Sequence, residues 1–401
     1  MKKLLIFLII PLTCCTKKNQ TLVLSNDSDR ALNFKEVIIS RDEMEVLDNK
    51  LPVFYDEEEQ LVATQLEDLD KDGTWDQVVF QTSLEAGANL KLSINWVESD
   101  EYPTFADSTQ VYMGYSKDRD GSFESVDTIV RPEDHVAQQP PYTYQFEGPG
   151  WESNLVAFRC YFDARNGKDI FGKTTEELVV HQIGTGENYH ELQDWGMDVL
   201  KVGTSLGAGS LALLKNDSLI RLGDTKFASF EKVVQGPIRS VFKLTYKGWD
   251  VLGTDYTLEE QITIYANQRG YKSEVKIPGH ASDTLITGIV NLKNANVNKF
   301  SAADFEILAT HGKQSENKDY LGMSIAAPRA STIAFSKAPT EGEGITNTEI
   351  VQLKSSNETY EFYFYAGWEL EDAIFADSSQ FETRLKEFAQ ANSSSIRFYF
   401  E

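Results

Sequence analysis

The chain has 401 residues, of which 41% are hydrophobic and 11% aromatic, so it can bury a large core. Its 62 acidic residues against 38 basic ones give a formal net charge of −24, and no basic stripe is visible. Nucleic acid is therefore excluded as an expected partner, because binding to phosphates needs clustered lysine and arginine. An anionic ligand would have to meet a local basic cluster against the field of the whole protein.

The N-terminus has the layout of a bacterial lipoprotein signal. Two lysines precede a short apolar run, which is shorter than the roughly 20 residues that span a bilayer. Cys14 and Cys15 end this run, and polar residues follow. An ordinary cleaved signal or a buried strand is the alternative, but cysteine at the cleavage point favours lipidation. We expect a signal over 1–14, a tether over 15–20, acylation of Cys14 or Cys15, and a periplasm-facing envelope protein whose lipid is its only membrane contact.

Beyond the tether, apolar and polar residues mostly alternate with the period of strands. There is no βα alternation, no Gly/Ser linker and no fixed repeat, which favours one all-β domain over 21–401. Phe381 and Leu385 recur at helical spacing behind Asp377, a suitable N-cap. The prediction is a large antiparallel β-sandwich with one C-terminal helix. The expected strands are 21–24, 36–40, 61–66, 76–82, 89–97, 110–115, 155–162, 230–251, 256–277, 284–292, 349–354, 361–368 and 395–400.

An acidic turn interrupts the early strands. Asp68, Asp70, Asp72 and Asp76 alternate with other residues around a glycine, as in the first half of a calcium loop. The glutamate expected at the twelfth place is replaced by Val79, and a polar β-turn is the alternative. If calcium binds here, we expect a structural role; no cofactor is required for the chemistry proposed below.

The strand over 155–163 carries a polar face. Its period of two places Val156, Phe158 and Cys160 on one side and Arg159 with Tyr161 on the other. Arginine suits a planar carboxylate, and tyrosine can transfer a proton. An exposed cross-strand ion pair is the alternative. Cys160, the one cysteine beyond the lipidation motif, is expected to be a buried apolar residue.

The segment over 140–209 lacks clean alternation and is expected to be an irregular region that carries function. His181 and His190 lie within it, and histidine is the natural general base near neutral pH. Trp151 and Trp195 could stack on a sugar or fill the core. The other polar candidates in this segment are Glu152, Arg165, Asn166, Lys173, Tyr189 and Lys201.

Several runs in this region resemble the signature of a long-uncharacterised domain family found in the glycan-utilisation gene clusters of marine and gut Gram-negative bacteria. They are Phe146-Glu147-Gly148-Pro149-Gly150-Trp151-Glu152-Ser153, Val156-Ala157-Phe158-Arg159, Asp163-Ala164-Arg165-Asn166, Asp169-Ile170-Phe171-Gly172-Lys173, Tyr189-His190, Asp194-Trp195-Gly196-Met197-Asp198 and Gly236-Pro237-Ile238-Arg239. The resemblance implies a sandwich related to mutarotase-like supersandwiches and activity on sugars. At least one similar protein is an oligosaccharide dehydratase in ulvan breakdown, which removes water from a terminal glucuronic or iduronic acid.

Dehydration of a uronic acid is a β-elimination, which needs a partner for the carboxylate, a base for the C5 proton and an acid for the C4 hydroxyl. We hypothesise that Arg159, helped by Arg165 or Lys201, binds the carboxylate of an anionic oligosaccharide. His190 would be the base, oriented by Glu152, and Tyr161 or Tyr189 the acid. Trp151, Asn166, Lys173, His181 and Trp195 would complete the binding site. The alternatives are a non-catalytic sugar-binding lipoprotein and a polysaccharide lyase or mutarotase-like enzyme.

Overall fold

The computed structural model describes residues 20–401 except 48, 133–134, 136 and 138–139. Cys14 and Cys15 lie outside the described residues, with the expected signal and most of the tether, so lipidation stays a prediction. Within the described part, antiparallel strands dominate and there is one α-helix, which confirms the expected all-β sandwich. None of the described helices is long and apolar enough to cross a bilayer.

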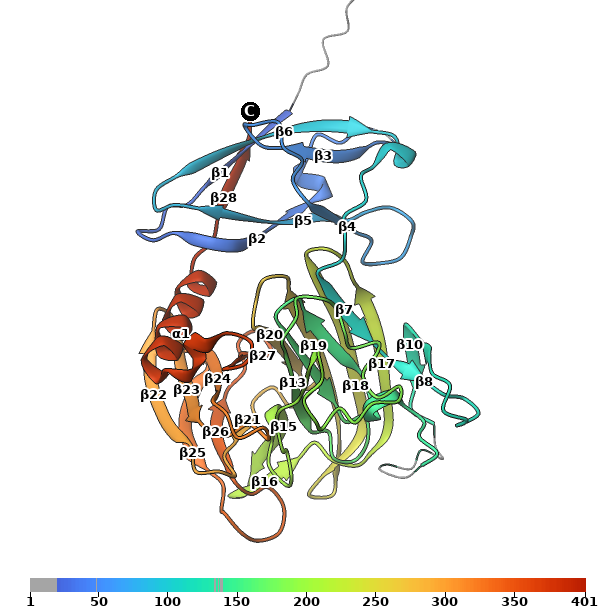
Figure 1. Cartoon of the computed structure of the whole chain (residues 1–401), viewed down its shortest axis with the longest axis vertical. Coiled ribbons are helices and arrows are strands. Elements are labelled where there is room, and N and C mark those ends of the chain that lie inside the picture. The colour runs from blue at the N-terminus through green and yellow to red at the C-terminus, as the bar shows by residue number, and fades with distance from the viewer. Residues whose placement is uncertain (1–19, 48, 133–134, 136, 138–139) are drawn as a thin grey trace, which may run out of the picture.

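Two small sheets pack together at one end of the molecule (Figure 1). Leu22, Phe54 and Ile94 from one sheet meet Ile39 and Phe80 from the other in a shared core. The last strand of the chain returns to pair with the first described strand, so both ends of the described chain lie in the same sheet. The first sheet contains β28 (Arg397–Phe400), β1 (Gln20–Ser25), β6 (Asn89–Val97) and β3 (Leu51–Tyr55), and the second β2 (Leu32–Ser40), β5 (Gln77–Leu84) and β4 (Thr64–Glu67).

A nine-stranded sheet forms one layer of the larger part of the molecule. Its strands alternate buried and exposed side chains, as the period-two pattern predicts. In spatial order the strands are β10 (Thr128–Val130), β17 (Thr225–Val234), β18 (Arg239–Val251), β19 (Thr254–Tyr265), β20 (Gly270–Lys276), β27 (Thr359–Trp368), β24 (Leu321–Pro328), β23 (Phe305–Gly312) and β22 (Asn296–Ala302).

Two five-stranded sheets face this layer. One core joins all three sheets: Phe158 and Leu211 from the five-stranded sheets meet Phe242, Tyr271 and Phe364 from the nine-stranded one. The first five-stranded sheet has the order β14 (Gly196–Asp198), β13 (Lys168–Lys173), β12 (Val156–Cys160), β11 (Gly150–Ser153) and β7 (Thr109–Tyr112). The second has the order β16 (Ser218–Arg221), β15 (Ala208–Lys215), β21 (Thr284–Val290), β26 (Thr348–Leu353) and β25 (Thr332–Lys337). A short hairpin pairs β8 (Gly114–Tyr115) with β9 (Glu124–Ser125).

The helix α1 (Ser378–Ser393) begins where the sequence predicts. The Asp377 side chain accepts hydrogen bonds from the backbone N–H groups of Ser379 and Gln380, which caps the first turn. Phe381 and Leu385 are buried against β23, β24 and β27. Short 3₁₀ turns lie at η1 (Arg41–Glu43), η2 (Ser99–Glu101), η3 (Gln145–Glu147) and η4 (Ala373–Ala376).

Two of the expected strands are each a pair of strands. The run over 230–251 contains β17 and β18, because Gly236-Pro237 turns the chain and proline cannot donate to a ladder. The run over 256–277 contains β19 and β20, with Asn267 in the left-handed region at the turn. The segment over 140–209, expected to be irregular, contributes β11 to β14 and the start of β15.

Candidate active site

The strand β12 is buried on both faces. Val156, Phe158 and Cys160 point into the main core, as the alternation predicts, and Cys160 is a buried free thiol. The opposite face was expected to line a surface or a groove. It is instead covered by a second cluster in which Ala157 packs with Phe146, Phe171 and Val180. Arg159, which projects from that face, therefore has a side chain only 2% exposed.

The register of three strands brings partners to Arg159. β12 places Arg159 opposite Asp169 of β13, and Asp198 of β14 lies opposite Phe171 of the same strand. The Arg159 Nη2 donates to Asp169 Oδ2 at 2.7 Å, to Asp198 Oδ2 at 2.8 Å and to Tyr161 Oη at 3.0 Å. Tyr161 Oη in turn donates to Asp169 Oδ2 at 2.8 Å. Burial and the nearby Asp198 raise the pKa of Asp169, and Arg159 partly offsets this.

His190 is the exposed end of this network. Its side chain is 62% exposed, and its Nδ1 lies 3.2 Å from Asp198 Oδ2. The hydrogen bond to Asp198 raises the pKa of His190, while partial burial opposes the shift. When Nδ1 carries the proton shared with Asp198, Nε2 is the ring atom that can accept one. The arrangement is that of a histidine whose orientation and basicity are controlled by a buried carboxylate.

A cleft of about 390 Å³ opens beside His190. Tyr189 lines it, and the Tyr189 hydroxyl accepts a 3.3 Å hydrogen bond from Arg159 Nη1. Glu147 adds a carboxylate, and most of the remaining wall is aromatic. Beyond His190, Tyr189 and Glu147, the lining residues are Phe123, Tyr142, Tyr144, Phe146, Gly184, Glu187 and Asn188.

Arg165 connects Glu147 to Tyr161. Its Nη2 donates to Glu147 Oε1 at 2.9 Å, its Nε donates to Asp163 Oδ1 at 2.9 Å, and its guanidinium carbon lies 4.0 Å from the centre of the Tyr161 ring. The Arg165 side chain is 28% exposed, far more than that of Arg159. Among these two arginines, Arg165 is therefore the one that a ligand can reach.

Glu152 does not orient the histidine, contrary to the sequence-based hypothesis. It is fully buried and pairs with Lys173, itself fully buried, at 2.9 Å. The second oxygen of Glu152 accepts hydrogen bonds from the backbone N–H groups of Val179 and Val180. This ion pair holds the backbone at Val179 and Val180, in the segment that covers β12. The carboxylate that contacts His190 is that of Asp198 instead.

Other predicted residues also lie away from the cleft. Trp151 is fully buried and stacks on Phe158, so it fills the core and reaches no surface. Trp195 is half-buried, with its ring centroid 6.0 Å from that of Phe171. Lys201 lies beside a separate small hollow, and Lys293 also lines it.

Two further candidates have structural partners. Asn166 is buried, and its Nδ2 donates to the carbonyl of Gly223. His181 is exposed, and its Nδ1 lies 3.2 Å from Gln110 Oε1. Partial burial lowers the pKa of His181. Among the described residues, no carboxylate pairs with His181, whereas His190 contacts Asp198.

Asp169, Asp198 and Glu147 were not among the candidates named from the sequence. All three occur in the runs that carry the family resemblance, but only the fold shows that they surround Arg159. Their presence in those runs was the available signal.

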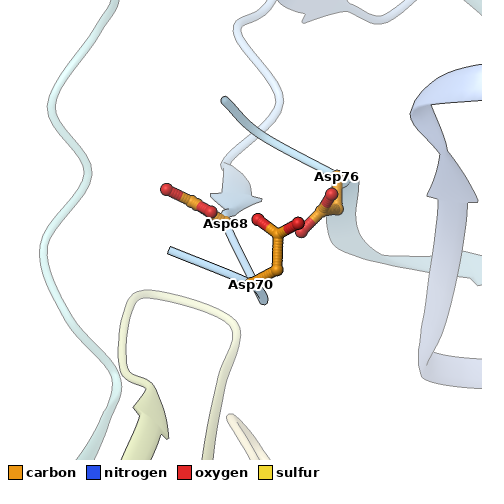
Figure 2. A group of neighbouring side chains, drawn as sticks. All are labelled: Asp68, Asp70 and Asp76. Carbon is orange, nitrogen blue, oxygen red and sulfur yellow. The ribbon is translucent and has the colours of Figure 1, made fainter. Parts of the chain in front are cut away.

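The acidic turn after β4 gathers three of its four aspartates. Carboxylate oxygens of Asp68, Asp70 and Asp76 lie within 4.8 Å of one another. Figure 2 shows these three side chains. Asp72 instead closes the turn by accepting from Thr74 N–H at 2.7 Å. Oxygen donors of this kind fit calcium, although they also accept backbone N–H groups, as in the alternative polar turn.

A family model described as a domain of unknown function, DUF4861, matches residues 24–397. The chain belongs to the DUF4861 family. A relative described as uncharacterized protein P7, from Formosa agariphila, is 24% identical over 411 residues, which cover 94% of this chain and 93% of the relative. The two small sheets at one end form a small sandwich, and the nine-stranded and five-stranded sheets form a large one. The family match extends over both sandwiches and includes every residue of the His190 network.

Two solved structures are similar to this DUF4861 chain at low sequence identity. An α-mannosidase from Enterococcus faecalis V583 is 9% identical, with a TM-score of 0.49, over 96% of this chain and 46% of that one. A protein of glycosyl hydrolase family 38 from Enterococcus faecalis is 8% identical, with a TM-score of 0.46, over 96% and 48%. The chain thus spans about half the length of both.

Proposed function

We propose that this protein is an oligosaccharide dehydratase that removes water from a terminal uronic acid by β-elimination. The observation that carries the proposal is the pairing of exposed His190 with buried Asp198 at a cleft that Tyr189 also lines. The resemblance to an ulvan-oligosaccharide dehydratase supports the same reaction and a glucuronic or iduronic substrate. The aromatic walls of the cleft are suited to sugar faces.

In the proposed reaction, the Nε2 of His190 takes the proton from C5 of the uronate. The electron pair of that C–H bond forms the C4–C5 double bond, and the C4–O bond breaks. The departing hydroxide takes a proton from Tyr189 and leaves as water, so atoms and charge balance. Tyr189 and His190 line the same cleft, which supports the assignment of an acid and a base to one substrate.

Arg159 has a different role in this proposal from the one expected. Asp169, Asp198, Tyr161 and Tyr189 already accept its hydrogen bonds, and it does not line the cleft. We assign Arg159 to positioning, because it fixes Asp198 and Tyr189 with one guanidinium. Arg165 does not line the cleft either, but its guanidinium is partly exposed and donates to Glu147 of the cleft wall, so we assign the substrate carboxylate to Arg165. In this assignment the substrate shares Arg165 with the carboxylates of Glu147 and Asp163.

The cysteine motif at the N-terminus supports the further proposal that the protein is tethered by lipid in the cell envelope. There, it would act on short anionic oligosaccharides that reach the periplasm.

Incubation of the protein with uronate-ended oligosaccharides tests the reaction. The unsaturated product absorbs near the ultraviolet edge, and chain length is followed in parallel. Absorbance should rise without chain shortening. In the His190→Ala variant the rate should fall by about two to four orders of magnitude with the fold intact. The control variant is His280→Ala, because His280 stacks on Tyr256 in a different part of the structure.

Three outcomes contradict the proposal. A rise in absorbance with chain shortening indicates a polysaccharide lyase. Measurable affinity without any product indicates a sugar-binding lipoprotein. Product formation by His190→Ala at the wild-type rate removes His190 from the chemistry.

A further inference from the structure

A second cleft has a volume of about 330 Å³. Arg165 lines it, and Arg165 is bonded to Glu147, which lines the His190 cleft. The Arg165–Glu147 ion pair therefore links the walls of the two clefts. The second cleft also contains Arg221, Thr204 and three glycines, of which Gly203 has a φ of +56°.

Arg221 in this cleft is held by backbone carbonyls. Its Nη2 donates to the carbonyls of Thr204 at 2.6 Å and Ser205 at 2.7 Å, and its Nη1 donates to that of Arg165 at 3.3 Å. Among the described residues, no carboxylate lies within ion-pair distance of it. These three bonds use three of the five N–H groups of a guanidinium. One Nη1 hydrogen and the Nε hydrogen have no hydrogen-bond partner among the described residues.

The surroundings of Arg221 differ from those of Arg159, Arg165 and Arg239, which each contact a carboxylate, and resemble those of Arg131, which donates to the carbonyl and hydroxyl of Thr225. Arg221 is half-buried, and burial lowers its pKa with no opposing acidic neighbour. A partly buried cation without a counter-ion is costly, and an anionic ligand removes that cost.

A purely structural role for Arg221 is the alternative, because its carbonyl contacts join β16 to the segment around Thr204 and Ser205. That role needs no open cleft beside the guanidinium. It also does not account for the glycines of the wall, which let a ligand approach the backbone closely. The cleft, the uncompensated charge and the free N–H groups together favour a ligand site.

We propose that the Arg221 cleft binds an oxyanion, a sulfate ester or a carboxylate, on the sugar next to the one at His190. This inference rests on the proposed function for the position of the reacting sugar. An oligosaccharide that crosses the Arg165–Glu147 pair occupies both clefts, with the reacting uronate beside His190 and Tyr189. The enzyme then selects substrates by the charge of the second sugar as well as of the first.

Binding to the His190→Ala variant tests the inference without turnover. Calorimetry would compare three uronate-ended disaccharides whose second sugar carries a sulfate ester, a carboxylate or only hydroxyls. At least one charged form should bind about tenfold or more tightly than the neutral form, since a hydrogen bond to a charged group is worth about 1.5–3 kcal/mol. The preferred form identifies which oxyanion the cleft takes.

Adding Arg221→Gln should reduce this preference to less than about twofold, and Arg221→Lys should keep part of it. The matched control is Arg329→Gln, because Arg329 is an exposed, ion-paired arginine in the turn after β24. The preference for the charged disaccharide should also decrease when sodium chloride is added, because salt screens the attraction between Arg221 and the anion. This measurement needs no substitution at Arg221.

Equal affinity for the three disaccharides overturns the inference. A preference for a charged disaccharide that persists in Arg221→Gln, or that does not change with salt, also overturns it. If the wild-type protein forms no unsaturated product but the preference depends on Arg221, the dehydratase proposal fails and the oxyanion site stands.

Discussion

At the scale of single residues, Asp198 contacts one buried side chain and one exposed side chain. It accepts from buried Arg159 at 2.8 Å and contacts exposed His190 at 3.2 Å. The same carboxylate oxygen, Oδ2, serves both. The position of His190 is therefore coupled to the buried network, although the histidine itself lies at the surface.

Replacing Asp198 with asparagine should shift the pH profile of the reaction. His190 acts as a base when neutral, so kcat/KM rises as pH increases through its pKa. Asp198 raises that pKa, and removing the negative charge lets it fall. The rising limb of the profile should move to lower pH in Asp198→Asn, with a lower plateau because the ring is less well oriented. A limb that stays in place or moves to higher pH contradicts this coupling.

The two candidate acids differ in their surroundings. Tyr161 is buried and donates to Asp169, whereas Tyr189 lines the cleft. Burial raises the pKa of both hydroxyls, so each stays protonated at neutral pH. We expect Tyr189→Phe to lower kcat by about two to four orders of magnitude, as for loss of a general acid.

The matched change Tyr161→Phe should have a smaller effect on kcat, because the Tyr161 hydroxyl contacts only Arg159 and Asp169 among described residues. Rates with saturating substrate would compare the two variants. If Tyr161→Phe has the larger loss, the assignment of the acid reverses.

At the scale of elements, a strand with two covered faces explains why Arg159 is rigid. β12 pairs with β11 and β13, its apolar face lies in the main core, and Phe146 with the segment from Val179 to Trp195 covers the other face. Gly167, which precedes β13, permits this packing: a Cβ there would lie 2.7 Å from the Tyr161 ring. Arg159, Asp169 and Asp198 thus come from strands, whereas His190 and Tyr189 come from a loop.

The acidic turn between β4 and β5 gives a prediction at the same scale. We propose that Asp68, Asp70 and Asp76 bind calcium and stabilise this connection. Calcium at a hundredfold excess over its dissociation constant should then raise stability by about 2.7 kcal/mol relative to protein in chelator. Thermal unfolding with and without calcium measures this, and Asp70→Asn should reduce the difference.

The control for this experiment is Asp250→Asn, since Asp250 is an exposed turn aspartate that accepts from Gly253 N–H. A melting temperature that does not respond to calcium in the wild-type protein leaves the polar β-turn as the correct interpretation.

Several of the strands that the sequence predicted have one covered and one exposed face. β2, β6 and β18 alternate buried and exposed residues, so their period is visible. β15 and β24 are buried almost throughout, and strands of this kind lose the alternation. β22 was missed for the opposite reason, because most of its residues are exposed.

At the candidate site, the period of two placed Arg159 and Tyr161 on one face, and the irregular composition pointed to His190. The partner of His190 could not be predicted in this way. Asp198 lies 39 residues from Arg159 and reaches it only through the register of β12, β13 and β14. Glu152, adjacent in sequence to the polar face, was the natural choice and is buried with Lys173 instead.

At the scale of the whole molecule, the two sandwiches have separate cores and meet through polar contacts. Arg239 of β18 donates to Glu67 of β4 twice, from Nε at 2.8 Å and from Nη2 at 2.6 Å. Gln65 accepts from the backbone N–H of Arg239, and a Cβ at Gly236 would lie 2.7 Å from the Gln65 side chain. The close approach at Gly236 therefore holds the turn between β17 and β18 against β4.

Removing Arg239 should be strongly destabilising. The Glu67 side chain is fully buried and that of Arg239 is 11% exposed, so Arg239→Ala leaves a buried carboxylate without its counter-ion. The expected loss is about 3–5 kcal/mol in the free energy of unfolding, measured by urea denaturation. Arg329→Gln, which breaks an exposed ion pair with Glu306, should cost about 0–1 kcal/mol.

The double variant Arg239→Met with Glu67→Leu separates charge burial from packing. It removes both charges and should recover much of the lost stability, because a buried ion pair is often replaced by apolar residues at little cost. Full recovery would show that the ion pair specifies how the sandwiches meet more than it stabilises them. If Arg239→Ala costs no more than Arg329→Gln, the contact between the sandwiches depends on the Gln65 hydrogen bonds instead.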